Sequence, residues 1–228
     1  IMIGLAIFAL FITLGGMKVI GYTDVIQVLV LTIGGLITSY IALTVVAEKF
    51  GYVHNALAGL QHLVKAAPDH FNMIFDKPTA GSTQKQIDDY SSLPGIAMML
   101  AGMWVANLNY WGCNQYITQR ALGADLKTAR TGILFAALLK LMMPLLVVVP
   151  GIAAYVLYQN GALQDQMMTG GVLNQDNAYS SVVSFLPVGL KGLSMAALTA
   201  AIVASLAGKA NSISTIYSLD IYKKYMNK

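Results

Sequence analysis

Trp104-Val-Ala-Asn-Leu-Asn-Tyr-Trp-Gly-Cys-Asn-Gln115 lies in the middle of an apolar segment, and this stretch decides how the chain folds. The residues before it, Leu93–Met103, are almost all apolar, which predicts a helix through a membrane. A spanning helix normally has few polar side chains, because each unpaired one raises the free energy in hydrocarbon. Here polar and aromatic side chains cluster around the helix-weakening Gly112, namely Asn107, Asn109, Tyr110, Trp111 and Asn114. We therefore expect a polar partner against this stretch.

The composition of the whole chain indicates an all-α integral membrane protein. Of its 228 residues 57% are hydrophobic and only 11% are charged, whereas soluble domains carry about 25% charged residues. The net charge of +4 comes from scattered Lys and Arg, so nucleic acid is not expected as a partner. The single cysteine, Cys113, excludes an intrachain disulfide. No motif of a soluble enzyme is present, so we expect no enzymatic activity.

Five stretches have spanning length, about 17–25 residues each. They predict one transmembrane domain over residues 1–228, an internal piece of a longer polytopic protein, with spans at 1–20, 25–47, 94–119, 132–158 and 188–217. The outer connections are 50–93 and 159–187, because Lys and Arg favour the cytoplasmic side for the other connections and the tail. Asp24 with Gln27 three residues on has the pattern of a capping box that opens the second span.

The two outer connections are predicted to combine short helices with a loop. An amphipathic helix is predicted over Val53–Val64 and is ended by Pro68. Lys77–Ser92 is polar and predicts a loop, whereas Asn177–Leu186 predicts a short helix. Three histidines recur every eight residues, which fits surface positions better than a metal site: His54, His62 and His70.

The polar cluster of the third span has two interpretations. It can be a structural cluster that hydrogen-bonds neighbouring helices, or a broken helix that lines a cavity near the membrane centre. Asn107 shares a helical face with Tyr110 and Trp111, three and four residues on. An amide beside two aromatic rings suits a polyhydroxylated ring, whose hydroxyls bond the amide while the aromatics cover its C–H face.

Two further positions carry polar groups at membrane depth. Lys140 lies about 12 Å from the cytoplasmic end of the fourth span, so it either snorkels to the surface or faces the same cavity. Pro144 and Pro150 predict a kink in that span. In the fifth span Ala201, Ala204 and Ser205 share a face, which permits close helix packing or, through its oxygens, cation binding.

Several separate motifs, in one order, resemble the sodium/solute symporter family, and in particular its bacterial sodium/glucose (sodium/galactose) cotransporters. They are Trp104–Arg120, Tyr22–Gln27, Pro150–Tyr155 and Ala200–Tyr222. The resemblance implies part of a leucine-transporter-type bundle of two inverted five-helix repeats. It implies sugar contacts for Asn107, Tyr110 and Lys140, with Tyr110 as an inner gate and Trp111 beside it.

The resemblance also implies a sodium site on the fifth span. The family's ligands correspond to Ala201, Ala204 and Ser205, and Asp24 corresponds to an aspartate on the sodium exit path. The family often has paired serines where this chain has Ala204-Ser205, so one hydroxyl ligand is absent. Without the family argument, Asp24 is either a helix cap or a carboxylate that attracts a departing cation.

Together these expectations describe a symporter that imports a sugar with sodium by alternating access. It would lie as a multi-pass protein in the lipid bilayer of the plasma membrane, the inner membrane of a bacterium. Sugar and sodium are the expected partners, and a homo-oligomer is left open. The alternatives are a family member for another solute (proline, pantothenate, sialic acid or an anion) or a non-transporting membrane sensor.

Overall fold

The chain is almost entirely helical. A computed structural model describes residues 2–226; residue 1, where the first predicted span begins, and residues 227–228 lie outside the described part. Within it, four helical segments are long and apolar enough to cross a membrane: Gly16–Lys49, Gln84–Cys113, Leu126–Gln159 and Val188–Met226. The first helix, α1 (Met2–Leu14), has only 13 residues and is shorter than the predicted first span.

The second helix begins earlier than the sequence predicts. α2 runs over Gly16–Lys49, directly after α1, and the chain reverses at Gly16, whose φ of +71° lies in the left-handed region that glycine adopts easily. Asp24 consequently lies inside α2, and the predicted cap there is wrong. The apolar runs on both sides of Gly21–Gln27 suggested two spans separated by a cap, whereas the helix continues through this polar interruption.

The third predicted span is interrupted, which agrees with the broken-helix interpretation of its polar cluster. It comprises α5 (Gly95–Ala97), η2 (Met98–Gly102), α6 (Met103–Leu108) and η3 (Asn109–Cys113), of which η2 and η3 are wound as π-helix. Asn114 then has extended backbone (ψ 112°), and its side chain accepts a hydrogen bond from the N–H of Tyr116 to open α7 (Gln115–Leu122). The break therefore lies at Asn114, two residues after the helix-weakening Gly112.

The predicted loop Lys77–Ser92 is wrong in its second half, which forms α4 (Gln84–Ser92). Thr83 accepts a hydrogen bond from the Gln86 N–H, and the Gln86 side chain accepts one from the Thr83 N–H. This reciprocal capping satisfies two backbone donors that would otherwise lack partners. Its signal, a threonine three residues before a glutamine, is present in the sequence.

The fourth span is continuous but irregular at its first proline. α8 (Leu126–Met143) passes through the π-helical η4 (Pro144–Val148) into α9 (Val149–Gln159). In a π-helix the carbonyl of Leu145 would accept from residue 150, a proline without an N–H. The Ser39 hydroxyl of α2 donates to this carbonyl instead, at 2.5 Å. The irregular segment is thus held by the neighbouring helix.

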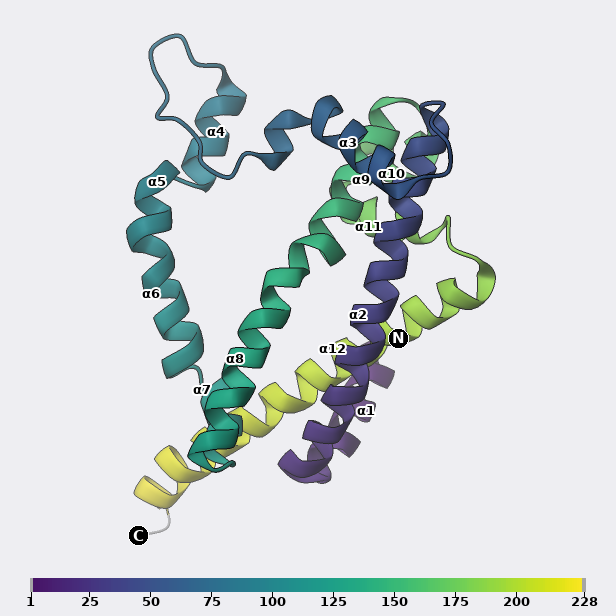
Figure 1. The fold of residues 1–228 in the computed structure, drawn as a ribbon. Helices are drawn as coiled ribbons and strands as arrows, with labels where there is room; N and C mark the ends of the chain where they lie inside the picture. Colours follow the sequence, from purple (N-terminus) through teal and green to yellow (C-terminus); the bar gives the residue numbers. More distant parts are fainter. Residues whose placement is uncertain (1, 227–228) are drawn as a thin grey trace.

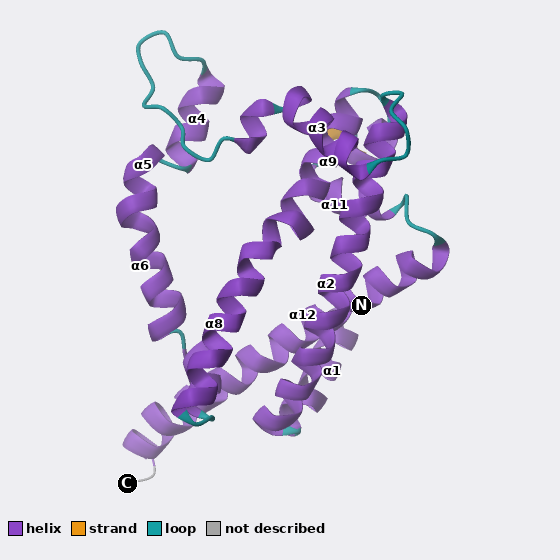
Figure 2. Ribbon diagram, viewed as in Figure 1, coloured by secondary structure: helices purple, strands orange, loops and turns teal. Residues whose placement is uncertain are grey.

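The remaining elements are a long last helix and short outer pieces. α12 (Val188–Ile216) continues as the π-helical η6 (Tyr217–Met226). The outer connections hold α3 (Ala56–Ala66) with η1 (Pro68–Phe71), and then the predicted α11 (Ala178–Val183) after α10 (Gln164–Met167) and η5 (Gln175–Asn177). β1 (Met168–Thr169) and β2 (Val172–Leu173) form a small antiparallel hairpin (Figure 2).

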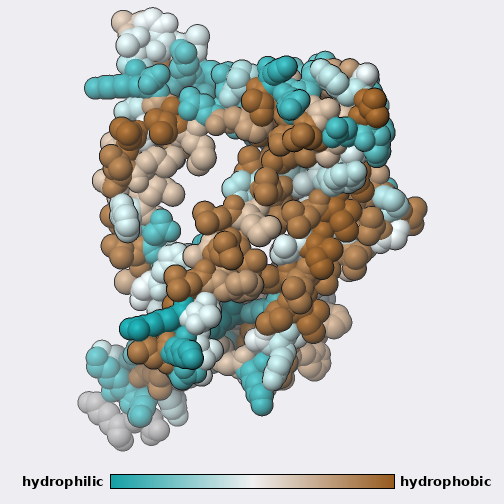
Figure 3. Space-filling model, in the orientation of Figure 1, coloured by the Kyte–Doolittle hydropathy of each residue, from teal (hydrophilic) through white to brown (hydrophobic). Residues whose placement is uncertain are grey.

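Two clusters of buried side chains hold the helices together. The larger joins α2, α3, α9 and α11 through residues such as Val46, Leu63, Leu157 and Val182. The smaller joins α1 to α12 through Ala9, Val203 and Ala207. The turns α1–α2 and α7–α8 and the C-terminal end lie at one end of the molecule, and the outer connections lie at the other (Figure 1). Apolar side chains dominate the surface between them, as a membrane requires (Figure 3).

Candidate functional site

The site begins with two aromatic rings at the end of the broken span. Tyr110 and Trp111 lie edge to face in η3, with ring centroids 5.3 Å apart and planes at 85°. The ammonium of Lys140, on α8, lies 3.9 Å from the centroid of the Tyr110 ring and 4.8 Å from that of the Trp111 ring. The fold thus brings three predicted residues from two separate spans into one constellation. The Lys140 ammonium lies over these rings, which agrees with the cavity interpretation and not with snorkelling to the cytoplasmic surface.

Asn107 lies one helical turn before the rings. Its amide nitrogen donates to the Met103 carbonyl of the same helix at 2.8 Å, and the side chain is exposed. Asn107 therefore has the spacing to reach a molecule held against Tyr110: one N–H of its amide is engaged within the helix, and the amide also has a second N–H and an acceptor oxygen. An opening separates the α5–α6 segment from the α8–α9 segment (Figure 3).

The predicted sodium ligands lie apart from these rings, on α12. Ala204 is buried, with 3% of its surface exposed, whereas Ser205 is exposed and Ala201 is partly buried. Helix α12 is unbroken across all three, so their backbone carbonyls lie in the regular helical ladder. Within residues 2–226 no group of three His, Cys, Asp or Glu side chains could hold a metal ion.

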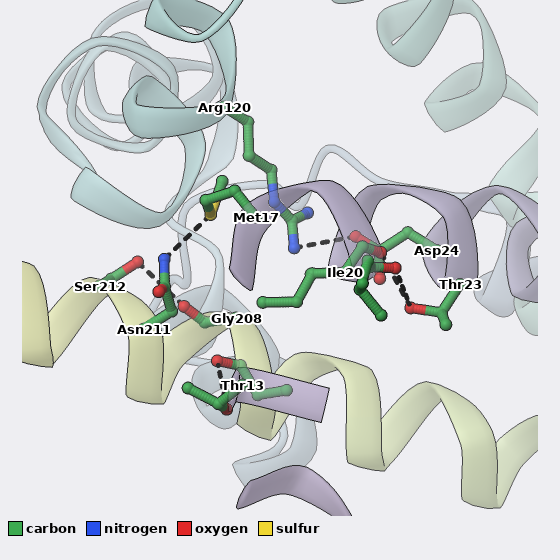
Figure 4. A network of polar contacts seen from close by, with 11 residues as sticks. Thr13, Met17, Ile20, Thr23, Asp24, Arg120, Gly208, Asn211 and Ser212 are labelled. Atoms are coloured by element: carbon green, nitrogen blue, oxygen red, sulfur yellow. Dashed lines mark hydrogen bonds and ion pairs between the residues drawn. The ribbon is translucent and has the colours of Figure 1, made fainter. Parts of the chain in front are cut away.

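Asp24 is partnered by a residue that the sequence did not single out. A carboxylate oxygen of Asp24, on α2, lies 2.8 Å from Nη2 of Arg120, on α7, and both side chains are partly buried (Figure 4). The Arg120 guanidinium carbon also lies 4.2 Å from the centroid of the Tyr116 ring, one turn earlier on α7. The sequence marks Arg120 only as a positive charge at a span end, and no local pattern identifies it as the partner of a residue 96 positions away.

Further contacts hold α7 and α2 against the last helix. The Gln119 amide donates to the Thr215 hydroxyl at 3.1 Å, and the Asn211 amide nitrogen lies 2.9 Å from the sulfur of Met17 (Figure 4). Gly208 is buried on α12 directly against the Tyr116 ring. The short helix that follows the break is therefore fastened to both α2 and α12.

The three histidines take part in separate local contacts. His54 pairs with Glu48, His62 stacks on Phe50 with centroids 3.9 Å apart, and His70 lies 4.3 Å from the Tyr155 ring. Each belongs to the outer region, and they do not converge.

Comparison with known proteins shows the family of the chain. Residues 1–228 match the Sodium:solute symporter family along their whole length. The chain belongs to this family. It is 46% identical, over 99% of its length, to the sodium/glucose cotransporter of Vibrio parahaemolyticus. It is also 34% and 33% identical, over 96% of its length, to the sodium/myo-inositol cotransporters 2 of Oryctolagus cuniculus and Homo sapiens.

The chain spans only part of these relatives. It covers 41% of the Vibrio protein and 33% of the rabbit and human proteins. Both the family and the relatives are transporters, and the helical, apolar architecture is that of a multi-pass membrane protein.

Proposed function

We propose that this chain is part of a sodium-coupled symporter that imports a galactose- or glucose-like sugar by alternating access. The observation that carries the proposal is the constellation of Tyr110, Trp111 and Lys140, in a chain closely similar to a sodium/glucose cotransporter. Rings at right angles offer an apolar face, and a flexible ammonium offers three donors. A pyranose needs both, because it has a C–H face and a rim of hydroxyls.

The proposed transport cycle uses these residues in turn. Sodium from outside stabilises the outward-open state, and sugar then binds against Tyr110 with Asn107 and Lys140 bonding its hydroxyls. Rocking of the helices exposes the site to the cytoplasm, and Tyr110 moves aside to release the sugar. Each sodium ion that enters contributes about 2.3 kcal/mol per 100 mV of membrane potential, in addition to its concentration gradient. The corresponding location is the plasma membrane, the inner membrane in a bacterium.

The sodium part of the proposal rests on α12 and α2. Ser205 would supply a hydroxyl, Ala201 a backbone carbonyl, and Ala204 a position without an oxygen ligand. Asp24 would lie on the exit path. A matched pair of variants tests this: Ser205→Ala should raise the sodium concentration needed for half-maximal uptake, and Ala204→Ser should lower it. Equal sodium dependence in both variants would contradict the assignment.

The sugar site is tested by sodium-driven galactose uptake into proteoliposomes that contain the full-length transporter. Tyr110→Ala should reduce uptake at least about tenfold, since it removes the stacking face. Tyr40→Ala, which replaces an exposed tyrosine of α2, is the control and should leave uptake unchanged. Unchanged uptake in Tyr110→Ala would remove the gate assignment. Uptake of proline without galactose would identify another solute, and galactose binding without flux would identify a sensor.

A further inference from the structure

One face of the Tyr110 ring is already covered. The Lys140 ammonium lies 3.9 Å from the centroid of this ring, which is the distance of direct contact. Trp111 stands at 85° to Tyr110, so the two rings form a corner, and the same ammonium lies 4.8 Å from the second ring. An ammonium in a corner of aromatic rings is held by the negative electrostatic potential of their faces.

Lys140 forms no ion pair with any of the described residues. The two ion pairs within residues 2–226 join His54 to Glu48 and Arg120 to Asp24, and neither involves Lys140. In this part of the chain the aromatic corner is therefore the feature that stabilises the charge at membrane depth.

One ring face can hold only one occupant. A sugar ring stacked on the face of Tyr110 that the ammonium covers needs the volume in which the ammonium now lies, so stacking on that face requires the ammonium to leave. The lysine stem has four rotatable bonds, which let the ammonium move to the rim of the ring without movement of α8. At the rim it meets the hydroxyls of the ligand and donates hydrogen bonds to them.

We propose that the Lys140 ammonium rests in the aromatic corner until substrate arrives, and that substrate binds by exchange with it. This inference rests on the proposed function, because it assigns the ligand face to Tyr110. The exchange selects ligands by chemistry. A neutral polyhydroxylated ring satisfies both the vacated aromatic face and the displaced ammonium. An apolar ring leaves the ammonium without acceptors, and a cationic amino sugar brings a second positive charge against it.

The exchange can be observed directly in the full-length transporter. Reductive methylation with ¹³C-formaldehyde labels the lysines, and Lys140→Arg identifies the resonance of Lys140. Without ligand this resonance should be shifted upfield by the ring currents of Tyr110 and Trp111, and saturating galactose should return it to the position of a free lysine. Lys127 is the control, since it is exposed on the same helix and should not move.

The possible results separate the exchange from the function on which it rests. Galactose binding, measured separately by equilibrium dialysis, with an unmoved Lys140 resonance would overturn the exchange alone. The absence of an upfield shift without ligand would overturn the resident contact. If galactose does not bind at all, the proposed function fails, and the exchange fails with it.

A competition experiment tests the selectivity. Protonated galactosamine should inhibit galactose uptake at least about tenfold more weakly than unlabelled galactose, because it opposes the lysine charge. Lys140→Met preserves length and removes the charge, so the difference between the two inhibitors should shrink or reverse. The measured quantity is the ratio of the inhibition constants of galactosamine and galactose, because Lys140→Met also weakens galactose binding itself. An unchanged ratio would overturn the selectivity, and the resonance of the unmodified sequence tests the exchange even if this variant does not fold.

Discussion

Gly208→Ala is expected to destabilise the transporter, although alanine is the better helix former. Gly208 lies in the interior of α12 and is buried against α7. A Cβ atom there would lie 2.9 Å from Nη2 of Arg120 and 3.1 Å from Cδ2 of Tyr116, and would overlap the neighbouring ring carbon Cε2. The ring and the guanidinium must both move, and the guanidinium is the one that contacts Asp24.

The magnitude follows from three terms. Overpacking of this kind costs about 1–3 kcal/mol, and loosening the partly exposed ion pair adds about 1 kcal/mol. The higher helix propensity of alanine returns about 1 kcal/mol. The net loss in the free energy of unfolding is therefore about 1–3 kcal/mol.

Gly192→Ala is the matched control. Gly192 lies on the same helix, is exposed, and has no atom within 4 Å of the position that an alanine Cβ would take. Only the helix-propensity term applies, so the free energy of unfolding of this variant should rise by up to about 1 kcal/mol. Thermal unfolding of the full-length protein in detergent should give a lower midpoint for Gly208→Ala and an equal or higher one for Gly192→Ala. Adding Tyr116→Ala should relieve part of the Gly208→Ala loss, as expected for contacting residues.

The reasoning would be refuted by equal shifts in the two glycine variants. It would also be refuted if Tyr116→Ala and Gly208→Ala were simply additive, because the proposed clash is with the Tyr116 ring.

Three further predictions concern polar contacts. Ser39→Ala should lower stability by about 1 kcal/mol, because the Leu145 carbonyl loses its hydroxyl donor at the π-helical segment; thermal unfolding measures the loss, and an unchanged midpoint would contradict the role. Asp24→Asn should lower the free energy of unfolding by about 1–3 kcal/mol, a loss between those for exposed and for buried ion pairs. A higher unfolding midpoint in this variant would show that the cost of burying the charge outweighs the attraction to Arg120. Hydrogen bonds from the Thr128 hydroxyl and N–H hold the pKa of the Asp125 carboxyl, the cap of α8, below its usual value. Since the pKa is lower in the folded state, the cap stabilises the folded state fully above the ordinary carboxyl pKa, and this stabilisation is lost as the pH falls through the lowered pKa. Hydrogen exchange of the backbone amides in the first turn of α8 should therefore quicken in that acid range. In Asp125→Asn the exchange rate, corrected for intrinsic exchange, should not depend on pH there.

Much of the candidate site could be predicted from one stretch of sequence. The spacing of Asn107, Tyr110 and Trp111 is local, since residues three and four apart share a helical face whatever the rest of the chain does. The same holds for the amphipathic pattern that became α3 and for the short helix α11. The capping signal of α4 is also local. The helix was missed because it has few apolar residues, so no helical period of hydrophobic side chains is visible in its sequence.

Chain length and hydropathy by themselves determined that this protein is helical and crosses a membrane, because backbone groups in hydrocarbon must bond within their own helix. Only the tertiary structure decided which polar groups meet. Asp24 was predicted as a cap and is instead paired with Arg120, and the Lys140 ammonium is on aromatic rings 29 and 30 positions away in the sequence. A helix's period and caps depend on neighbours within about four residues, whereas these contacts depend on how whole helices rotate and pack against one another. No local pattern encodes that rotation, and for this reason the partners of Asp24 and Lys140 became visible only in the folded chain.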